Sequence, residues 1–257
     1  MPTLSGKPTF GAGRVFMRSN VTNPTPVRSL VPQSQSIDMK RKVESLFGER
    51  QLAVAVGAGE MEITGKVEFG KTNARIFSDI MFGVSQSTGS YLQADKETGT
   101  VPGSSTYVIT VANASNFQFD LGVINATTGA IYTRVAAGSE VSGASYSVVE
   151  SGINKGKYTF AAADANANML ISYVYSSSSI GSTASITNQM QGLTGLFQAV
   201  HVLPWGAQQD MIVFNNCLAA STSISAKKSG FGMTSFDYQA SADNNDVLGT
   251  MTFAEAA

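Results

Sequence analysis

Residues 60–83 read Glu-Met-Glu-Ile-Thr-Gly-Lys-Val-Glu-Phe-Gly-Lys-Thr-Asn-Ala-Arg-Ile-Phe-Ser-Asp-Ile-Met-Phe-Gly, and the chain is organised around this stretch. Its first half alternates between polar and apolar side chains, which predicts a strand with one hydrated face and one apolar face. The apolar set consists of Met61, Ile63, Val67 and Phe69. The polar set consists of Glu60, Glu62, Thr64, Lys66 and Glu68.

The second half of the stretch changes period after Gly70. Its apolar residues recur at the spacing of one helix stripe, at Ile76, Phe77, Ile80 and Met81. Thr72 can cap the start of such a helix and Gly83 can close its end. The pattern therefore predicts one α-helix at about 72–82, flanking a structure made mostly of strands.

The composition fits a mainly β structural protein. The chain has 257 residues with 25 glycines, and only 14% of the residues are charged. The formal net charge of −1 gives no strong attraction for nucleic acid or a membrane surface. The charge is uneven, since residues 1–75 carry 11 basic and 6 acidic side chains and the remainder carries 6 and 12. Copies could attract one another head to tail, or the charges could simply be solvated.

Cysteine and hydropathy exclude several classes of protein. The single Cys217 excludes an internal disulfide and most metal clusters. No run of 18 apolar residues predicts a membrane span, and the first residues lack the apolar core of a signal peptide. We expect synthesis in a reducing cytoplasm.

Three regions are expected from turn residues and strand spacing. Residues 1–35 are rich in proline and predict an irregular N-terminal arm, within which 13–18 could form one short strand. Residues 36–97 and 179–257 predict one β domain, in which 51–69 form a hairpin that turns at Gly57-Ala-Gly59. Residues 98–178 predict an inserted, sandwich-like β module, because short strands and turn signals alternate there about every ten residues.

Catalytic chemistry is not expected, and neither is a cofactor or a metal. His201 is the single histidine and lies within an apolar strand pattern, which favours a structural role. Asp164-Ala-Asn-Ala-Asn168 copies half of a calcium loop but lacks its sixth-position glycine and its twelfth-position acid. Lys40, Arg41 and Lys42 form a basic run without the interleaved aromatic residues of a nucleic-acid site.

The order of these features resembles the major tail tube protein of tailed bacteriophages. The resemblance covers about 36–95 and 180–257, and the block between them is similar to a segment carried by some tube proteins. The residues that carry it are Leu46-Phe-Gly48, Thr64-Gly-Lys66, Ile80-Met-Phe-Gly83 and Asp210-Met-Ile-Val-Phe-Asn-Asn-Cys-Leu-Ala219.

The resemblance implies a β-sandwich or barrel subunit flanked by one helix. Six subunits would form a ring, and rings would stack into a hollow tube that conducts DNA from capsid to host without binding it. The implied partners are further copies of the chain, the tail terminator, the tape measure protein and a sheath where the tail is contractile. The implied location is the virion tail, assembled in the host cytoplasm.

Two sets of residues carry the site hypotheses. We expect Glu60, Glu62, Thr64, Lys66 and Glu68 to line the lumen, where three acids and one base give −2 per subunit and repel phosphates. The competing interpretation is that this face meets outside solvent. We expect the N-terminal arm to contact the adjacent ring through Lys7, Arg14, Arg18 and Arg28.

The alternative function is a β-rich adhesin or tail accessory module that recognises a surface glycan. Exposed aromatic residues clustered in the insert would favour it. The candidates are Tyr107, Phe117, Phe119, Tyr132, Tyr146 and Tyr158.

Overall fold

The computed structural model describes all residues except 1–10, 21–22, 48, 189–194, 206–207 and 255–257. The protein is mainly β, with 59% strand and 6% helix, and has two sheets of which one curls into a half-barrel. Contacts divide the chain into two compact units, one made of 1–86 and 184–257 and the other of Ser87–Thr183. The predicted module 98–178 lies inside the second unit. Among the described residues, no helix is long and apolar enough to span a membrane.

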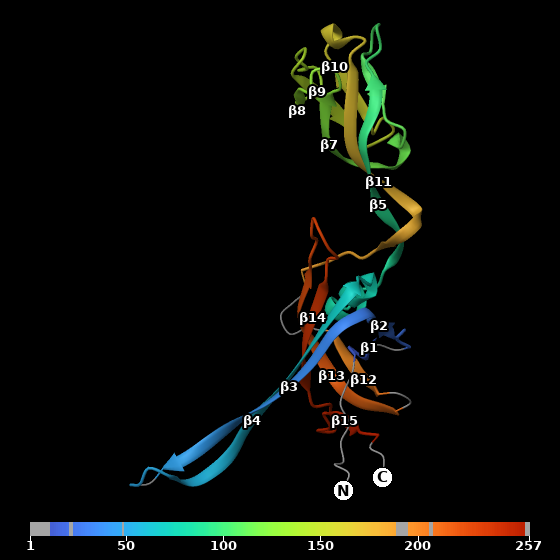
Figure 1. Ribbon diagram of the computed structural model, residues 1–257. Helices are drawn as coiled ribbons and strands as arrows, with labels where there is room; N and C mark the ends of the chain where they lie inside the picture. The colour runs from blue at the N-terminus through green and yellow to red at the C-terminus, as the bar shows by residue number, and fades with distance from the viewer. Residues whose placement is uncertain (1–10, 21–22, 48, 189–194, 206–207, 255–257) are drawn as a thin grey trace. The chain divides into compact units, whose positions relative to one another are not determined.

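The first unit is built on an antiparallel sheet in which the order is β2-β1-β12-β13-β14-β4-β3, with β15 on β13 (Figure 1). Its strands are β1 (Arg14–Ser19), β2 (Val27–Arg28), β3 (Leu30–Phe47), β4 (Ala53–Lys71), β12 (Leu196–Trp205), β13 (Gln208–Ile224), β14 (Thr234–Ser241) and β15 (Gly249–Thr252). Ser29 alone separates β2 from β3. One continuous segment therefore pairs with β1 at its start and with β4 further along, which brings the two ends of the sheet order together.

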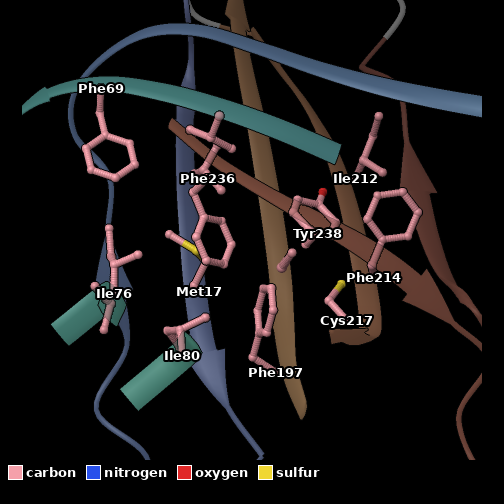
Figure 2. Packing of buried hydrophobic residues seen from close by; sticks show 14 of the residues in the cluster. Met17, Phe69, Ile76, Ile80, Phe197, Ile212, Phe214, Cys217, Phe236 and Tyr238 are labelled. Carbon is pink, nitrogen blue, oxygen red and sulfur yellow. The ribbon is translucent and has the colours of Figure 1, made fainter. Parts of the chain in front are cut away.

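One face of this sheet carries the core of the first unit. Figure 2 shows side chains from β1, β4, β12, β13 and β14 converging on it, with Ile76 and Ile80 below them. Phe69, Phe197, Phe214 and Phe236 are almost fully buried. Each fully buried aromatic or aliphatic side chain contributes about 2 kcal/mol, so this cluster is a major source of favourable free energy for the unit.

The predicted α-helix at 72–82 is not found. Helical backbone at 74–75 leads into the π-helical segment η1 (Ile76–Met81), where Phe82 N donates to Phe77 O. Thr72 does not cap the segment, because its hydroxyl pairs with that of Thr234 at 2.9 Å. The wider turn still buries Ile76 and Ile80, so the apolar stripe was predicted correctly and the helix type and length were wrong.

The N-terminal region is more regular than the predicted arm 1–35, although β1 matches the short strand expected at 13–18. β1, β2 and the start of β3 belong to the sheet, and Val15, Met17 and Val27 lie in the core. Alternation at Val15, Met17 and Ser19, all buried, outweighs the prolines around them. Residues 1–10 lie outside the described part of the chain.

The predicted hairpin 51–69 is wrong as well. β4 runs without interruption through Gly57 and Gly59, and its hairpin partner is β3, with the turn between Phe47 and Ala53. Glycines in a strand usually indicate a turn or bulge, and here a register shift falls at Arg41/Val43, opposite 58–61. The two strands are therefore much longer than the pattern predicted.

The second unit has its own sheet and its own core. The sheet order is β5-β11-β7-β8-β9-β10-β6, and two 3-10 turns, η2 (Ala114–Asn116) and η3 (Ala162–Asp164), lie between strands. Tyr158 and Tyr173 are fully buried in the core. The strands are β5 (Ser87–Thr100), β6 (Val108–Thr110), β7 (Phe117–Asn125), β8 (Ile131–Arg134), β9 (Ser145–Val149), β10 (Lys157–Phe160) and β11 (Asn168–Thr183).

Candidate assembly surfaces

The polar face of β4 lies opposite the core of the first unit. Ile63, Val67 and Phe69 are buried, and Glu62, Thr64, Lys66 and Glu68 are exposed or half-buried on the other face. The predicted alternation therefore holds from Glu62 to Phe69. It does not hold at Glu60 and Met61, which are both exposed near the register shift with β3.

The neighbouring strands extend this polar face. Lys66 lies in register between Ser36 on β3 and Asp237 on β14, and Glu68 lies between Ser34 and Ser235. We use the name polar sheet face for Glu62, Thr64, Lys66 and Glu68 of β4 together with the residues in register with them on β3 and β14. Its charged members, also in register, are Asp38, Glu62, Glu68, Asp237, Lys40 and Lys66, which sum to −2.

Two of the four acids of the polar sheet face, Glu68 and Asp237, have hydroxyl or lysine partners, although Asp237 Oδ1 is buried without a hydrogen-bond partner. The Ser34 hydroxyl donates to Glu68 at 3.0 Å, and Lys66 Nζ lies 3.4 Å from the same carboxylate. The Ser221 hydroxyl donates to Asp237 at 2.7 Å. These two hydroxyl groups donate within the sheet, so they are not free to donate to a ligand.

The predicted arginines gather at the other end of the sheet order. Arg14 and Arg18 lie exposed on β1, on the face opposite Val15 and Met17, and Arg28 on β2 lies 5.8 Å above the ring of Phe16. None of the three forms an ion pair among the described residues. Lys7 lies outside the described residues. The structure thus brings three of the four predicted cations onto neighbouring strands.

The far half of the β3–β4 hairpin was not singled out from the sequence. We call residues 38–62 the distal hairpin, and Figure 1 shows it leading away from the other strands of this unit. All its described side chains are exposed except the half-buried Ala53. Val43, Val54 and Val56 lie on one of its faces, with exposed fractions of 61%, 72% and 66%.

An isolated two-stranded hairpin is marginally stable in water. The distal hairpin pairs with no third strand among the described residues, and it leaves apolar side chains uncovered. The available sequence signal was the low charge and alternating valines of 53–58, which the hairpin prediction treated as an ordinary strand. Contiguous exposed apolar surface on a monomer indicates an interaction site.

His201 and Cys217 are the buried groups of the first unit that could carry chemistry, and both are in structural environments. His201 on β12 contacts Gln35 and Tyr238, and burial lowers its pKa to about 4. Burial raises the pKa of Cys217 to about 12, so the thiol is a poor nucleophile. Within the parts of the chain that the structure describes, no three His, Cys, Asp or Glu side chains are grouped to hold a metal ion.

The aromatic candidates of the second unit are mostly core residues. Phe117, Tyr132, Tyr146 and Tyr158 are at most 4% exposed, whereas Phe119 is 46% exposed. The Tyr158 hydroxyl donates to Asp120 at 2.9 Å, and the Tyr146 hydroxyl donates to the same carboxylate. These tyrosines therefore do not form an exposed stacking platform.

Comparison with known proteins identifies no relative: no protein-family model matches the chain, and a search of curated proteins gives no match.

Proposed function

We propose that this protein is a structural subunit that polymerises with copies of itself into stacked rings and forms a hollow tail tube. The single observation that carries the proposal is the distal hairpin, whose valine face is exposed along its length. Covering such a face with a second copy removes apolar area from water, at about 25 cal/mol per Å². Self-association is the simplest way to stabilise a hairpin that lacks a third strand.

The charge of the polar sheet face also supports the proposal, because the wall of a tube that conducts DNA should not bind it. Its charge of −2 per subunit would place −12 around a ring of six, which is the number that the resemblance implies. A negative wall rich in bonded hydroxyls repels phosphates, so DNA would slide without sticking. Arg14, Arg18 and Arg28 are offered as contacts to the next ring, and DNA, terminator, tape measure and sheath remain proposed partners.

The glycan-binding alternative has less support. A glycan site uses exposed aromatic faces, and four of the six candidate aromatic residues are in the core of the second unit. No catalytic function is proposed, since His201 and Tyr238 are bonded to each other in the interior of the first unit and the buried thiol of Cys217 is a poor nucleophile.

Negative-stain electron microscopy of the purified full-length protein tests the proposal. Hollow rods or rings at high protein concentration are the expected result. Particles that remain featureless monomers at every concentration and salt condition, with native strand content by circular dichroism, would exclude a tube-forming role.

A further inference from the structure

His201 lies where three strands meet inside the first unit. Its Nδ1 is 2.8 Å from Gln35 Oε1 on β3, and its Nε2 forms a hydrogen bond with the Tyr238 hydroxyl on β14. None of β12, β14 and β3 are neighbours in the sheet order. The imidazole ring therefore ties together strands that the backbone ladder does not join directly.

The two contacts define the neutral form of the ring. Gln35 Oε1 can only accept, so Nδ1 carries the proton and Nε2 accepts from the Tyr238 hydroxyl. A second proton would have to occupy Nε2, which would force the Tyr238 hydroxyl to turn its own proton away. Protonation would also place a positive charge on a side chain that is 0% exposed.

No described carboxylate lies within ion-pair distance of the ring to compensate that charge. The titratable groups that face the interior from the neighbouring strands are Tyr238 on β14 and Cys217 and Asp210 on β13, whereas Arg14, Arg18 and Asp237 alternate with buried residues and lie on the opposite face. Asp210 is in register with Leu203 and accepts from Ala254 N at 2.9 Å. The register partner of His201 on β1 is Val15.

The side chain of Gln35 packs closely against Gly13 where it approaches the His201 ring. A Cβ built on Gly13 would lie 2.3 Å from Gln35 Nε2 and 2.4 Å from Val202 O, so the side chain fits because residue 13 is glycine. Gln35 Nε2 itself is buried without a hydrogen-bond partner. The His201 contact is the one hydrogen bond that this side chain makes among the described residues, so its loss leaves a buried amide unsatisfied.

We propose that His201 is an acid-sensitive clasp whose protonation releases β3 from the interior of the sheet and frees the base of the distal hairpin. The burial that lowers the pKa of His201 sets where this happens, since the ring stays neutral near pH 7 and takes up a proton only in acid. The clasp is a property of one subunit and does not depend on the tube proposal.

Cys217 provides a built-in reporter, because it is 0% exposed in the same core as Tyr238. The full-length protein is labelled with 4,4′-dithiodipyridine, which reacts in acid, and each rate is divided by that of a free thiol at the same pH. Between neutral pH and about pH 4.5 we expect a rise of roughly tenfold, reversible and without loss of strand signal by circular dichroism. The His201→Gln protein should show no such rise.

Gln35→Glu is the second variant, and it keeps the histidine. A carboxylate against Nδ1–H pairs with the protonated ring in the closed state, so protonation no longer breaks this contact, and the rise in labelling at acidic pH should be less than about half that of the wild type. The clasp is excluded if labelling of the wild type stays flat, if His201→Gln rises in parallel with it, or if Gln35→Glu rises as much as the wild type. Should His201→Gln fail to fold, the size of the rise in Gln35→Glu decides alone.

Discussion

At the residue scale, Gly65 is the glycine of β4 at which an added Cβ atom would meet the closest contact. A Cβ there would lie 2.1 Å from Tyr238 Cζ, and Tyr238 is held by its bond to His201. The ring has no room to move, since it also contacts Phe197 and Phe236. We expect Gly65→Ala to lower the free energy of unfolding of the first unit by about 3 kcal/mol, measured by urea denaturation.

Gly57 provides the matched control on the same strand. A Cβ built there meets nothing within 4 Å, because Gly57 lies in the distal hairpin. Gly57→Ala should change the free energy of unfolding by less than about 0.5 kcal/mol. Equal losses in the two variants would show that strand propensity, and not contact with Tyr238, sets the requirement at Gly65.

A second residue-scale prediction concerns alkaline stability of the second unit. Burial, together with the bonds to Asp120, raises the pKa of Tyr146 and Tyr158 in the folded state. A raised folded pKa stabilises the fold below the unfolded pKa of about 10, and this contribution is lost as the pH rises above it. We expect the melting temperature of an isolated second unit to fall steeply above about pH 10.

Tyr158→Phe tests that assignment. It removes one ionisable hydroxyl, while Asp120 still accepts from Tyr146 and from Gly122 N at 3.0 Å. We expect a loss of about 1 kcal/mol at neutral pH and a shallower decline in alkali. An unchanged alkaline slope would place the responsible ionisation elsewhere.

At the scale of the element, the distal hairpin determines self-association in our proposal. Two charges on its valine face, in the double variant Val54→Glu with Val56→Glu, should abolish rods and rings in electron microscopy. The melting temperature of the first unit should change little, because neither valine belongs to its core.

Ile153→Glu is the control for the distal hairpin variant. Ile153 is 99% exposed and belongs to the second unit, so the substitution adds one carboxylate at an exposed apolar site that is not part of the hairpin. Rods should form normally. Normal assembly of the double valine variant would contradict the proposed role of the hairpin, whereas loss of assembly in both proteins would point to a general effect of charge.

Sequence patterns predicted the local chemistry of these elements better than their extent. Alternation identified the polar and apolar faces of β4 from Glu62 onward, and the helix stripe identified Ile76 and Ile80 as buried. Partner choice was not encoded locally, so the β3–β4 pairing and the strand character of Gly57 and Gly59 were missed. Thr72, which was expected to cap an α-helix, instead bonds to Thr234, a partner far away in sequence that no local pattern indicates.

At the scale of the whole molecule, the contact between Gln35 and His201 spans 166 residues of sequence. Hydrophobic periodicity does not indicate a contact between residues so far apart in sequence. The apolar neighbours of His201 predicted that it is structural but did not predict its partner. The same holds for β2 and β3, whose continuity joins the ends of the sheet order although each pairs with a different strand. Closure of the sheet is thus a tertiary property that single-sequence reasoning does not reach.

The two units should fold independently, because each has its own core and the chain crosses between them only near 86–87 and 183–184. Thr88 and Ser182 are register partners on β5 and β11. Joining these two residues through a short Gly-Ser linker removes most of the second unit and keeps the chain of the first unit continuous. We expect the shortened chain and an isolated 87–183 fragment each to unfold cooperatively, and calorimetry of the full chain to resolve both transitions.

If the first unit forms tubes, the shortened chain should form them as well, since the distal hairpin and polar sheet face are intact. A single transition in the full chain, with neither piece folding alone, would mean that the two cores depend on each other.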